Sequence, residues 1–283
     1  MSEEHAVNIG CEASCVIEDP WKDLGAFTAA RIALGRAGQS LPLKPYLAFK
    51  LAHARARDAV HMPFNGEGIL AALSEKGIQT LHAVSAAENK HEYLTRPDKG
   101  RKLSDESYKE LKAYGEAQKG AEPDICVVIS DGLSARAVHE NAVEFAVQFL
   151  ERVKRAGFSC SPVVVVDSGR VAVGDEAAAL LHARLVVILI GERPGLTSPN
   201  SLSAYMTYAP YPGVREDMRN CISNVRRDGL PIEEAVRKLC YLTEEAFARK
   251  LSGVELKDDM PSCYIPFEHS LHVGFGKENY FQK

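Results

Sequence analysis

Three apolar runs decide the fold: Ile125-Cys-Val-Val-Ile-Ser130, Pro162-Val-Val-Val-Val166 and Leu185-Val-Val-Ile-Leu-Ile190. Each run is rich in β-branched residues and too short for a helix, which is typical of strands that are buried on both faces. Helical sequence separates them, from Ser134 to Ala156 and from Asp175 to Ala183. Apolar strands that alternate with helices predict an α/β fold with a mostly parallel sheet.

Sequence on the N-terminal side of these runs is predicted to be mainly helical. Helices are expected from Leu24 to Leu34, from Leu43 to Val60, and from Ser104, as the cap residue, to about Gln118. The segment from Glu67 to Val84 favours a helix followed by a short strand, and Glu92-Tyr93-Leu94 favours a short extended piece. We therefore expect a helical region ahead of the sheet. The basic residues of its helix from Leu43 are explained either by a solvated, ion-paired face or by contact with an anionic group or a partner subunit.

These patterns divide the chain into three parts. Residues 1–120 form the mainly helical region, and residues 121–253 form the sheet domain, whose last helix runs from Pro231 to Lys250. Residues 254–283 form a tail without a clear hydrophobic period. The turn around Gly120 and Pro123 marks the first boundary.

Composition limits the class of protein. The 283 residues carry a net charge of −4 and are 46% hydrophobic, values that argue against disorder and give no reason to expect nucleic acid as a partner. The longest aliphatic run is far below the ~20 residues that span a bilayer, so no membrane segment is expected. The seven scattered cysteines indicate reduced thiols in the cytoplasm, and their spacing predicts no metal site.

Each of the three predicted strands ends in an unusual loop. The loops read Ser130-Asp131-Gly132-Leu133-Ser134, Asp167-Ser168-Gly169-Arg170-Val171 and Gly191-Glu192-Arg193-Pro194-Gly195. Any one of them is explained by ordinary turn chemistry, in which Gly, Asp and Ser are common. Because the carboxyl ends of parallel strands share one edge of a sheet, the three loops together predict a ligand site there. Glu192 is the most suggestive residue, since its carboxylate can accept hydrogen bonds from amide donors.

The usual catalytic and nucleotide-binding motifs are missing. No Gly-x-Gly-x-x-Gly or Gly-x-x-x-x-Gly-Lys-Ser/Thr sequence follows any of the strands, and Gly132-Leu133-Ser134-Ala135-Arg136 lacks the second glycine of a nucleophile elbow. A stand-alone enzyme that acts on a nucleotide is therefore weakly supported. We predict no catalytic residue in this chain.

Several motifs in a fixed order resemble the family of ethanolamine ammonia-lyase small (β) subunits, over residues 20–253. Those in the first 170 residues are Gly35-Arg36-Ala37-Gly38, Tyr93-Leu94-Thr95-Arg96-Pro97-Asp98 with Gly100-Arg101, Val127-Val-Ile-Ser-Asp-Gly-Leu-Ser134 and Gly169-Arg170-Val171. Those that follow are Val186-Val-Ile-Leu-Ile-Gly-Glu-Arg-Pro-Gly-Leu196, Ser201-Leu-Ser203 and Cys221-Ile-Ser-Asn224. Each is weak alone, and their order and spacing make the resemblance specific.

This resemblance implies the activity, the cofactor and the partner. The family converts ethanolamine to acetaldehyde and ammonia with adenosylcobalamin, through a substrate radical that follows homolysis of the cobalt–carbon bond. The large subunit is implied to hold the substrate and the catalytic groups. The small subunit is implied to be a Rossmann-like domain that closes over the cobalamin at the subunit interface of a hetero-oligomer. The resemblance also implies a cytoplasmic enzyme, within a bacterial microcompartment in some members.

Three cofactor contacts carry over by position. They are Val171 in Gly-Arg-Val, Glu192 in Gly-Glu-Arg-Pro-Gly and Cys221 in Cys-Ile-Ser-Asn. Glu192 is expected to bond corrin side-chain amides, Val171 to offer backbone and apolar contact, and Cys221 to give the ring a small, soft surface. Strand-end capping, core packing and a buried thiol are the ordinary alternatives. A non-catalytic cobalamin or small-ligand binding module is the alternative function.

One absent motif generates a prediction about the cobalt. Many cobalamin mutases use Asp-x-His-x-x-Gly, whose histidine replaces the benzimidazole of the cofactor on cobalt, and this chain has no such sequence. We expect this chain to supply no cobalt ligand, so that the cofactor keeps its own base. The EPR spectrum of cob(II)alamin bound to the complex with the large subunit checks this, and superhyperfine coupling to a protein histidine nitrogen would contradict it.

Overall fold

A computed structural model describes residues 15–118, 120 and 122–267 of the chain. The chain divides into two compact units, Met1–Arg55 and Ala56–Lys283, and helix α1 (Leu43–His61) crosses this division. The predicted boundary lay at residue 120. The division falls earlier because β3 (Thr80–Val84), which precedes residue 120, pairs with a strand of the sheet domain. Cys11 and the last residues of the predicted tail, 268–283, lie outside the described residues.

Residues 15–42, the described part of the first unit before α1, contain little regular structure. Strand β1 (Val16–Ile17) pairs antiparallel with β2 (Arg36–Ala37), and a short 3-10 helix, η1 (Lys22–Ala26), lies between them. The predicted helix over residues 24–34 is wrong. The Thr28 hydroxyl accepts a hydrogen bond from the Ala30 N–H at 3.1 Å, a local turn that competes with helical bonding.

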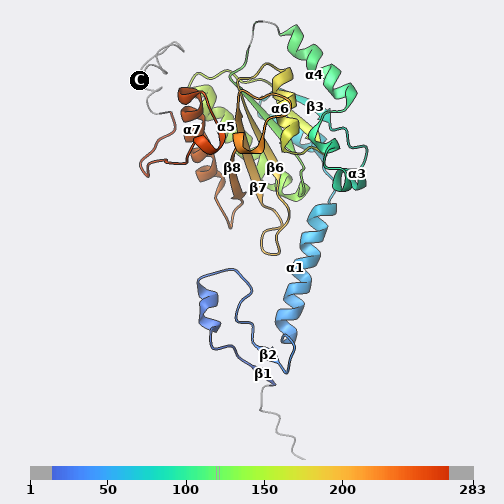
Figure 1. Ribbon diagram of the computed structural model, residues 1–283, viewed down its shortest axis with the longest axis vertical. Helices are drawn as coiled ribbons and strands as arrows, with labels where there is room; N and C mark the ends of the chain where they lie inside the picture. The colour runs from blue at the N-terminus through green and yellow to red at the C-terminus, as the bar shows by residue number, and fades with distance from the viewer. Residues whose placement is uncertain (1–14, 119, 121, 268–283) are drawn as a thin grey trace, which may run out of the picture. The chain divides into compact units, whose positions relative to one another are not determined.

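The second unit is built on a six-stranded sheet in the order β3-β5-β4-β6-β7-β8 (Figure 1). The strands after β3 are β4 (Ile125–Ser130), β5 (Val163–Asp167), β6 (Leu185–Gly191), β7 (Leu202–Tyr208) and β8 (Asn220–Val225). Strands β3, β5, β4 and β6 are parallel, whereas β7 and β8 add antiparallel pairs. The α/β fold with a mostly parallel sheet is thus confirmed.

Two sets of helices cover the two faces of the sheet. Helices α2 (Gly66–Glu75), α5 (Ala135–Arg155) and α7 (Ile232–Arg249) share one apolar core with the odd-numbered residues of β4 and β6. Helices α4 (Asp105–Ala117) and α6 (Val171–Leu180) share the other core with the even-numbered residues. Both faces are buried, which explains why the three runs are apolar throughout.

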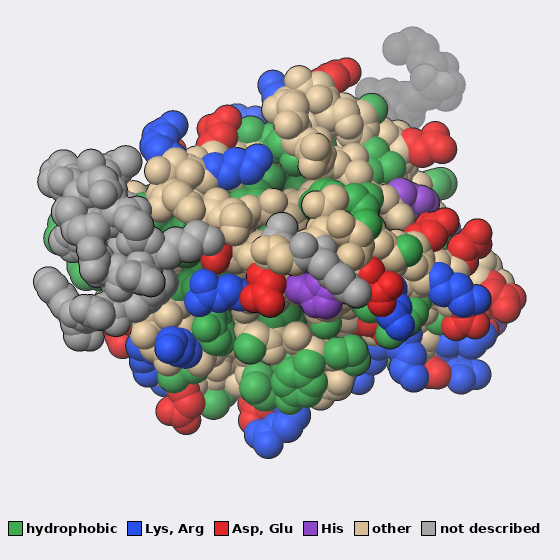
Figure 2. Space-filling view, turned by 90° about the horizontal axis from the view of Figure 1, so that it is seen from above, with side chains coloured by type: hydrophobic (Ala, Val, Ile, Leu, Met, Phe, Trp, Pro, Cys, Tyr) green, Lys and Arg blue, Asp and Glu red, His purple; other side chains and the backbone are tan. Residues whose placement is uncertain are grey.

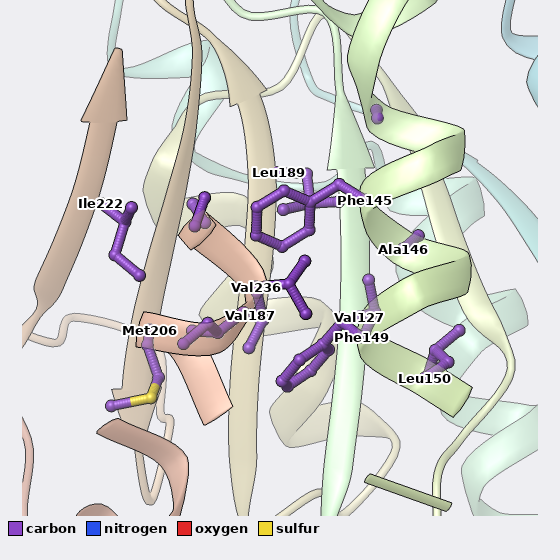
Figure 3. Packing of buried hydrophobic residues seen from close by; sticks show 14 of the residues in the cluster. Val127, Phe145, Ala146, Phe149, Leu150, Val187, Leu189, Met206, Ile222 and Val236 are labelled. Carbon is purple, nitrogen blue, oxygen red and sulfur yellow. The ribbon is translucent and has the colours of Figure 1, made fainter. Parts of the chain in front are cut away.

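The larger core contains aromatic side chains of α5. Phe145 and Phe149 extend from this helix toward Val187 and Leu189 of β6, with Val236 of α7 beside them (Figure 3). Both phenylalanines are almost completely buried. Burial of one such side chain contributes ~1.5–3 kcal/mol, so this layer fixes α5 on the sheet.

The segment between β3 and α4 differs from its prediction. Helix α3 (Lys90–Thr95) replaces the expected extended piece at residues 92–94, and a 3-10 helix, η2 (Lys99–Arg101), follows it. The side chain of Asn89 accepts the N–H of Glu92 at 3.0 Å and begins α3. This cap overrides the β propensity of the tyrosine that follows, because it satisfies a free N–H of the first turn.

The surface carries charges of both signs. Lys and Arg side chains are interspersed with Asp and Glu side chains on the face that Figure 2 shows. Among the described residues, no group of three or more His, Cys, Asp or Glu side chains could hold a metal ion. None of the described helices is long and apolar enough to cross a membrane.

A buried ion pair joins the β7–β8 connection to α6. The guanidinium of Arg219 donates to the carboxylate of Asp175, and the side chains of the two residues are only 2% and 1% exposed. Arg219 also donates to the Val214 carbonyl at 2.9 Å and lies 3.4 Å from the Thr207 hydroxyl. Burial raises the pKa of Asp175, while Arg219 acts in the opposite direction. The ion pair therefore holds the start of β8 against α6, and it stabilises this contact only while both charges are in place.

The substitution Arg219→Met should destabilise the chain strongly. It leaves the Asp175 carboxylate buried without its cation, and breaking a buried pair in this way costs about 3–5 kcal/mol. Urea unfolding measures the loss, and the double variant Asp175→Asn/Arg219→Met should recover part of it. Arg215→Met, which breaks an exposed pair with Asp217, is the control and should cost at most about 1 kcal/mol. Equal stability of Arg219→Met and Arg215→Met would contradict the assignment.

Candidate functional site

A hollow of about 200 Å³ lies at the carboxyl ends of β4, β5 and β6. Strand order reverses here, because β5 and β6 lie on opposite sides of β4. Crevices at such reversals are the usual ligand sites of open α/β sheets. The lining residues come from all three predicted loops, from Ile190 of β6 and from two tyrosines: Tyr93, Gly132, Leu133, Arg170, Val171, Ile190, Gly191, Glu192, Arg193 and Tyr205.

Larger hollows lie elsewhere, but they bring fewer of the predicted residues together. One of about 660 Å³ lies beside β3 and the start of α4, and one of about 400 Å³ lies near the amino ends of β4 and β5. Neither contains Val171, Glu192 or Cys221. The smaller hollow is the candidate site because two of these three residues line it.

The loop before Val171 is held against β4. Ser168 takes a left-handed φ of 56°, and the next N–H, that of Gly169, donates to the Ser130 hydroxyl at 2.9 Å. A Cβ at Gly169 would lie 2.7 Å from this hydroxyl oxygen, closer than real Cβ atoms come. Only glycine lets the loop approach β4 so closely, and the approach places Val171 at the first turn of α6.

Tyr93 of α3 contacts this loop and stabilises its position. The Arg170 guanidinium donates to the Tyr93 carbonyl at 2.9 Å and lies 4.6 Å from the centre of its ring. The Lys90 ammonium lies 4.8 Å from the same ring and pairs with the buried Asp131 at 3.2 Å. Burial raises the pKa of the Tyr93 phenol, which stays protonated and donates to the Gly169 carbonyl at 3.3 Å. These contacts fix the position of the Val171 loop.

Glu192 joins the ends of three strands. Its carboxylate accepts hydrogen bonds from the hydroxyls of Ser201 (2.8 Å) and Ser203, and from the Asn224 N–H at 2.9 Å. Asn224 has a left-handed φ of 59°, which Asn tolerates better than most residues. A carboxylate has about four acceptor positions, so roughly one remains for a ligand.

Cys221 lies beside the hollow without lining it. It pairs across the sheet with Tyr205, which does line the hollow, and its sulfur lies 4.0 Å from the Ser203 hydroxyl that donates to Glu192. Desolvation raises the pKa of the thiol, and the Glu192 carboxylate adds to this shift. Cys221 is therefore a protonated free thiol on the exposed side of β8.

Two of the three sequence-predicted residues, Val171 and Glu192, thus line the hollow, and Cys221 lies beside it on β8. The structure adds Tyr93, Arg170, Arg193 and Tyr205, to which the sequence prediction gave no role. The first three stand in the motifs quoted above, which is the signal that could have found them. Nothing in the sequence pointed to Tyr205, because the strand that contains it, β7, was not predicted.

The chain matches a known family over most of its length. The family described as Ethanolamine ammonia-lyase light chain (EutC) matches residues 18–257. The chain belongs to this family. The matched residues include every residue that lines the hollow. Because the match begins at residue 18, it also covers part of the first unit.

Relatives in this family share half of the residues. A protein of Pseudomonas fluorescens named ethanolamine ammonia-lyase small subunit is 52% identical over 242 residues, which cover 86% of this chain and 88% of its own. A Pseudomonas putida protein of the same name is 50% identical over 86% of this chain and 89% of its own. A Xanthomonas campestris protein of that name is 52% identical over 85% and 88%. The chain is therefore similar to these light chains along nearly their whole length.

Loss of the Glu192 carboxylate should destabilise the chain. Glu192→Ala leaves two hydroxyls and one N–H without their acceptor, and a hydrogen bond to a charged group contributes about 1.5–3 kcal/mol. We expect the free energy of unfolding of the isolated chain to fall by about 2–3 kcal/mol, because the site is only half-buried. Chemical denaturation measures it, with the exposed Glu151→Ala on α5 as the control. A Glu192→Ala variant as stable as this control would show that the three bonds contribute nothing.

Proposed function

We propose that the chain is the small subunit of an adenosylcobalamin-dependent ethanolamine ammonia-lyase and holds one part of the cofactor at its interface with the large subunit. The placement of Val171 and Glu192 in the hollow at the reversal of strand order, with Cys221 beside it on β8, carries the proposal. Family membership supports the activity. The reversal also supports a Rossmann-like assignment of the sheet domain.

The size of the hollow supports an interface role. Sites that enclose a small molecule usually have volumes of about 300–1,000 Å³, whereas this hollow has about 200 Å³. It has room for only a fraction of a molecule as large as a cobalamin. The remaining surface of the cofactor would need a second wall, which a large subunit would supply.

The residues of the hollow fit the chemistry of a cobalamin edge. The remaining acceptor position of Glu192 suits a corrin amide N–H, and the first turn of α6 at Val171 offers apolar contact. The Cys221 thiol, protonated and small, lets a ring approach β8 without an unpaired charge. When bound, adenosylcobalamin supplies the radical that starts the deamination. This chain contributes binding and orientation, with no catalytic residue, no ligand to cobalt and a base-on cofactor.

The first unit has the surface expected of a subunit contact. Several of its large apolar side chains are exposed, among them Trp21 (67%), Phe27 (86%) and Leu43 (71%). Such a concentration of exposed apolar side chains marks an interaction surface. We assign it to the large subunit. A cytoplasmic location, inside or outside a microcompartment, remains a prediction of the sequence.

Reconstitution tests the proposal. The chain and a large subunit from its own genome are purified together, and acetaldehyde formation from ethanolamine is measured with each component left out in turn. We expect activity only when both chains and adenosylcobalamin are present. Full activity of the large subunit alone would contradict the claim.

Titration of the isolated chain with adenosylcobalamin distinguishes the proposed function from the alternative, a non-catalytic cobalamin-binding module. A small hollow with one wall should bind adenosylcobalamin weakly, and the absorbance of the cofactor should change only when the large subunit is added. Tight binding by the isolated chain, without copurification of a large subunit, would instead favour a cobalamin-binding module.

A further inference from the structure

The hollow contains more positive than negative charge. Two guanidinium groups line it, those of Arg170 and Arg193, and Glu192 is the one carboxylate among its lining residues. The side chains that line the hollow therefore have a net positive charge, although the whole chain has a net charge of −4.

The carboxylate of Glu192 forms no ion pair with either arginine. Its two oxygens accept from Ser201, Ser203 and Asn224, as described above. Among residues 15–118, 120 and 122–267, neither Arg170 nor Arg193 forms an ion pair with a carboxylate. The positive charge at this edge of the sheet is thus left for a ligand.

The two arginine side chains differ in conformational freedom. Arg170 is stacked on Tyr93 and bonded to its carbonyl, and its Nε is buried without a hydrogen-bond partner. Arg193 is exposed and forms no hydrogen bond within the described part of the chain. Arg170 therefore contributes a fixed positive charge, while Arg193 can turn its guanidinium toward a bound group.

We propose that Arg193, supported by the charge of Arg170, forms an anion subsite of the hollow that takes the phosphodiester of the nucleotide loop of cobalamin. The inference rests on the proposed function and extends it to one group of the cofactor. The peripheral side chains of a cobalamin are neutral amides, and its nucleotide loop contains a single phosphodiester, which is anionic. The planar guanidinium fork matches the oxygens of a phosphate, and a charge-assisted bond of this kind is stronger than a bond to a neutral amide.

Two corrinoids that differ in this group test the subsite. Adenosylcobalamin has the nucleotide loop, and adenosylcobinamide lacks both the loop and its phosphodiester. Dissociation constants of the complex with the large subunit are measured by absorbance titration, without turnover. Arg193→Ala should raise the Kd for adenosylcobalamin about 10- to 100-fold and leave the Kd for adenosylcobinamide within about twofold. Arg193→Lys should recover part of the affinity, because it keeps the charge and loses the fork.

The control is Arg155→Ala. Arg155 is exposed at the C-terminal end of α5, at the opposite edge of the sheet, and its loss should change neither dissociation constant. Copurification with the large subunit and an unchanged melting temperature show that each variant is assembled. Equal weakening for both corrinoids would place Arg193 on the corrin and overturn the subsite, as would no weakening for either.

The salt dependence of binding gives a second measurement. The Kd for adenosylcobalamin should rise with salt concentration in the wild-type complex, and less steeply in Arg193→Ala, because screening acts on the charge pair. An unchanged slope would overturn the proposal even if adenosylcobinamide binds too weakly to titrate. If the wild-type complex binds neither corrinoid, the proposed function itself is overturned. If the wild-type complex binds both corrinoids and the Arg193→Ala variant binds them equally well, only the anion subsite is overturned.

Discussion

The carboxylate of Glu192 is the interaction on which the site depends. It follows a parallel strand that is buried along its whole length, and it accepts hydrogen bonds from the segments of both antiparallel strands that complete the sheet. One charged group therefore sets how the β7–β8 hairpin meets the parallel core. It also draws Cys221 and Tyr205 toward the hollow, since both lie on the strands that it joins. The residue that makes these bonds also lines the hollow, so a change there alters both the strand packing and the lining.

The other wall of the hollow depends on contacts between distant segments. Tyr93 of α3 and Arg170 before α6 are bonded to each other, and Gly169 fits against Ser130 of β4. None of these contacts is strong alone. Together they hold a loop whose backbone is in a left-handed conformation at Ser168, which would otherwise be unfavourable. The site is thus rigid on the side of β5 and adaptable at Arg193.

The sequence predicted β4, β5 and β6 well because burial on both faces leaves an unbroken apolar run. Strand β4 begins and ends where the run does, and β6 extends it by one residue. Strands β7 and β8 were missed because their polar residues, such as Ser203 and Asn224, serve the site instead of the core. The proximity of Glu192 and Cys221 followed from the resemblance alone. That Arg193 forms no ion pair within the described part of the chain could not be predicted, because it depends on where the folded chain places its acidic side chains.

The order of the segments along the chain has a consequence for biosynthesis. The hollow is lined by Tyr93 and Tyr205, and its Glu192 accepts the N–H of Asn224 from β8, so these contacts join residues far apart in sequence. Contacts of this kind form late in folding. On the ribosome, β4, β5 and β6 emerge with their carboxyl ends bare, and Glu192 has no donor from β8 until residues beyond 220 leave the exit tunnel. We therefore expect the hollow to be completed only after β8 has left the ribosome.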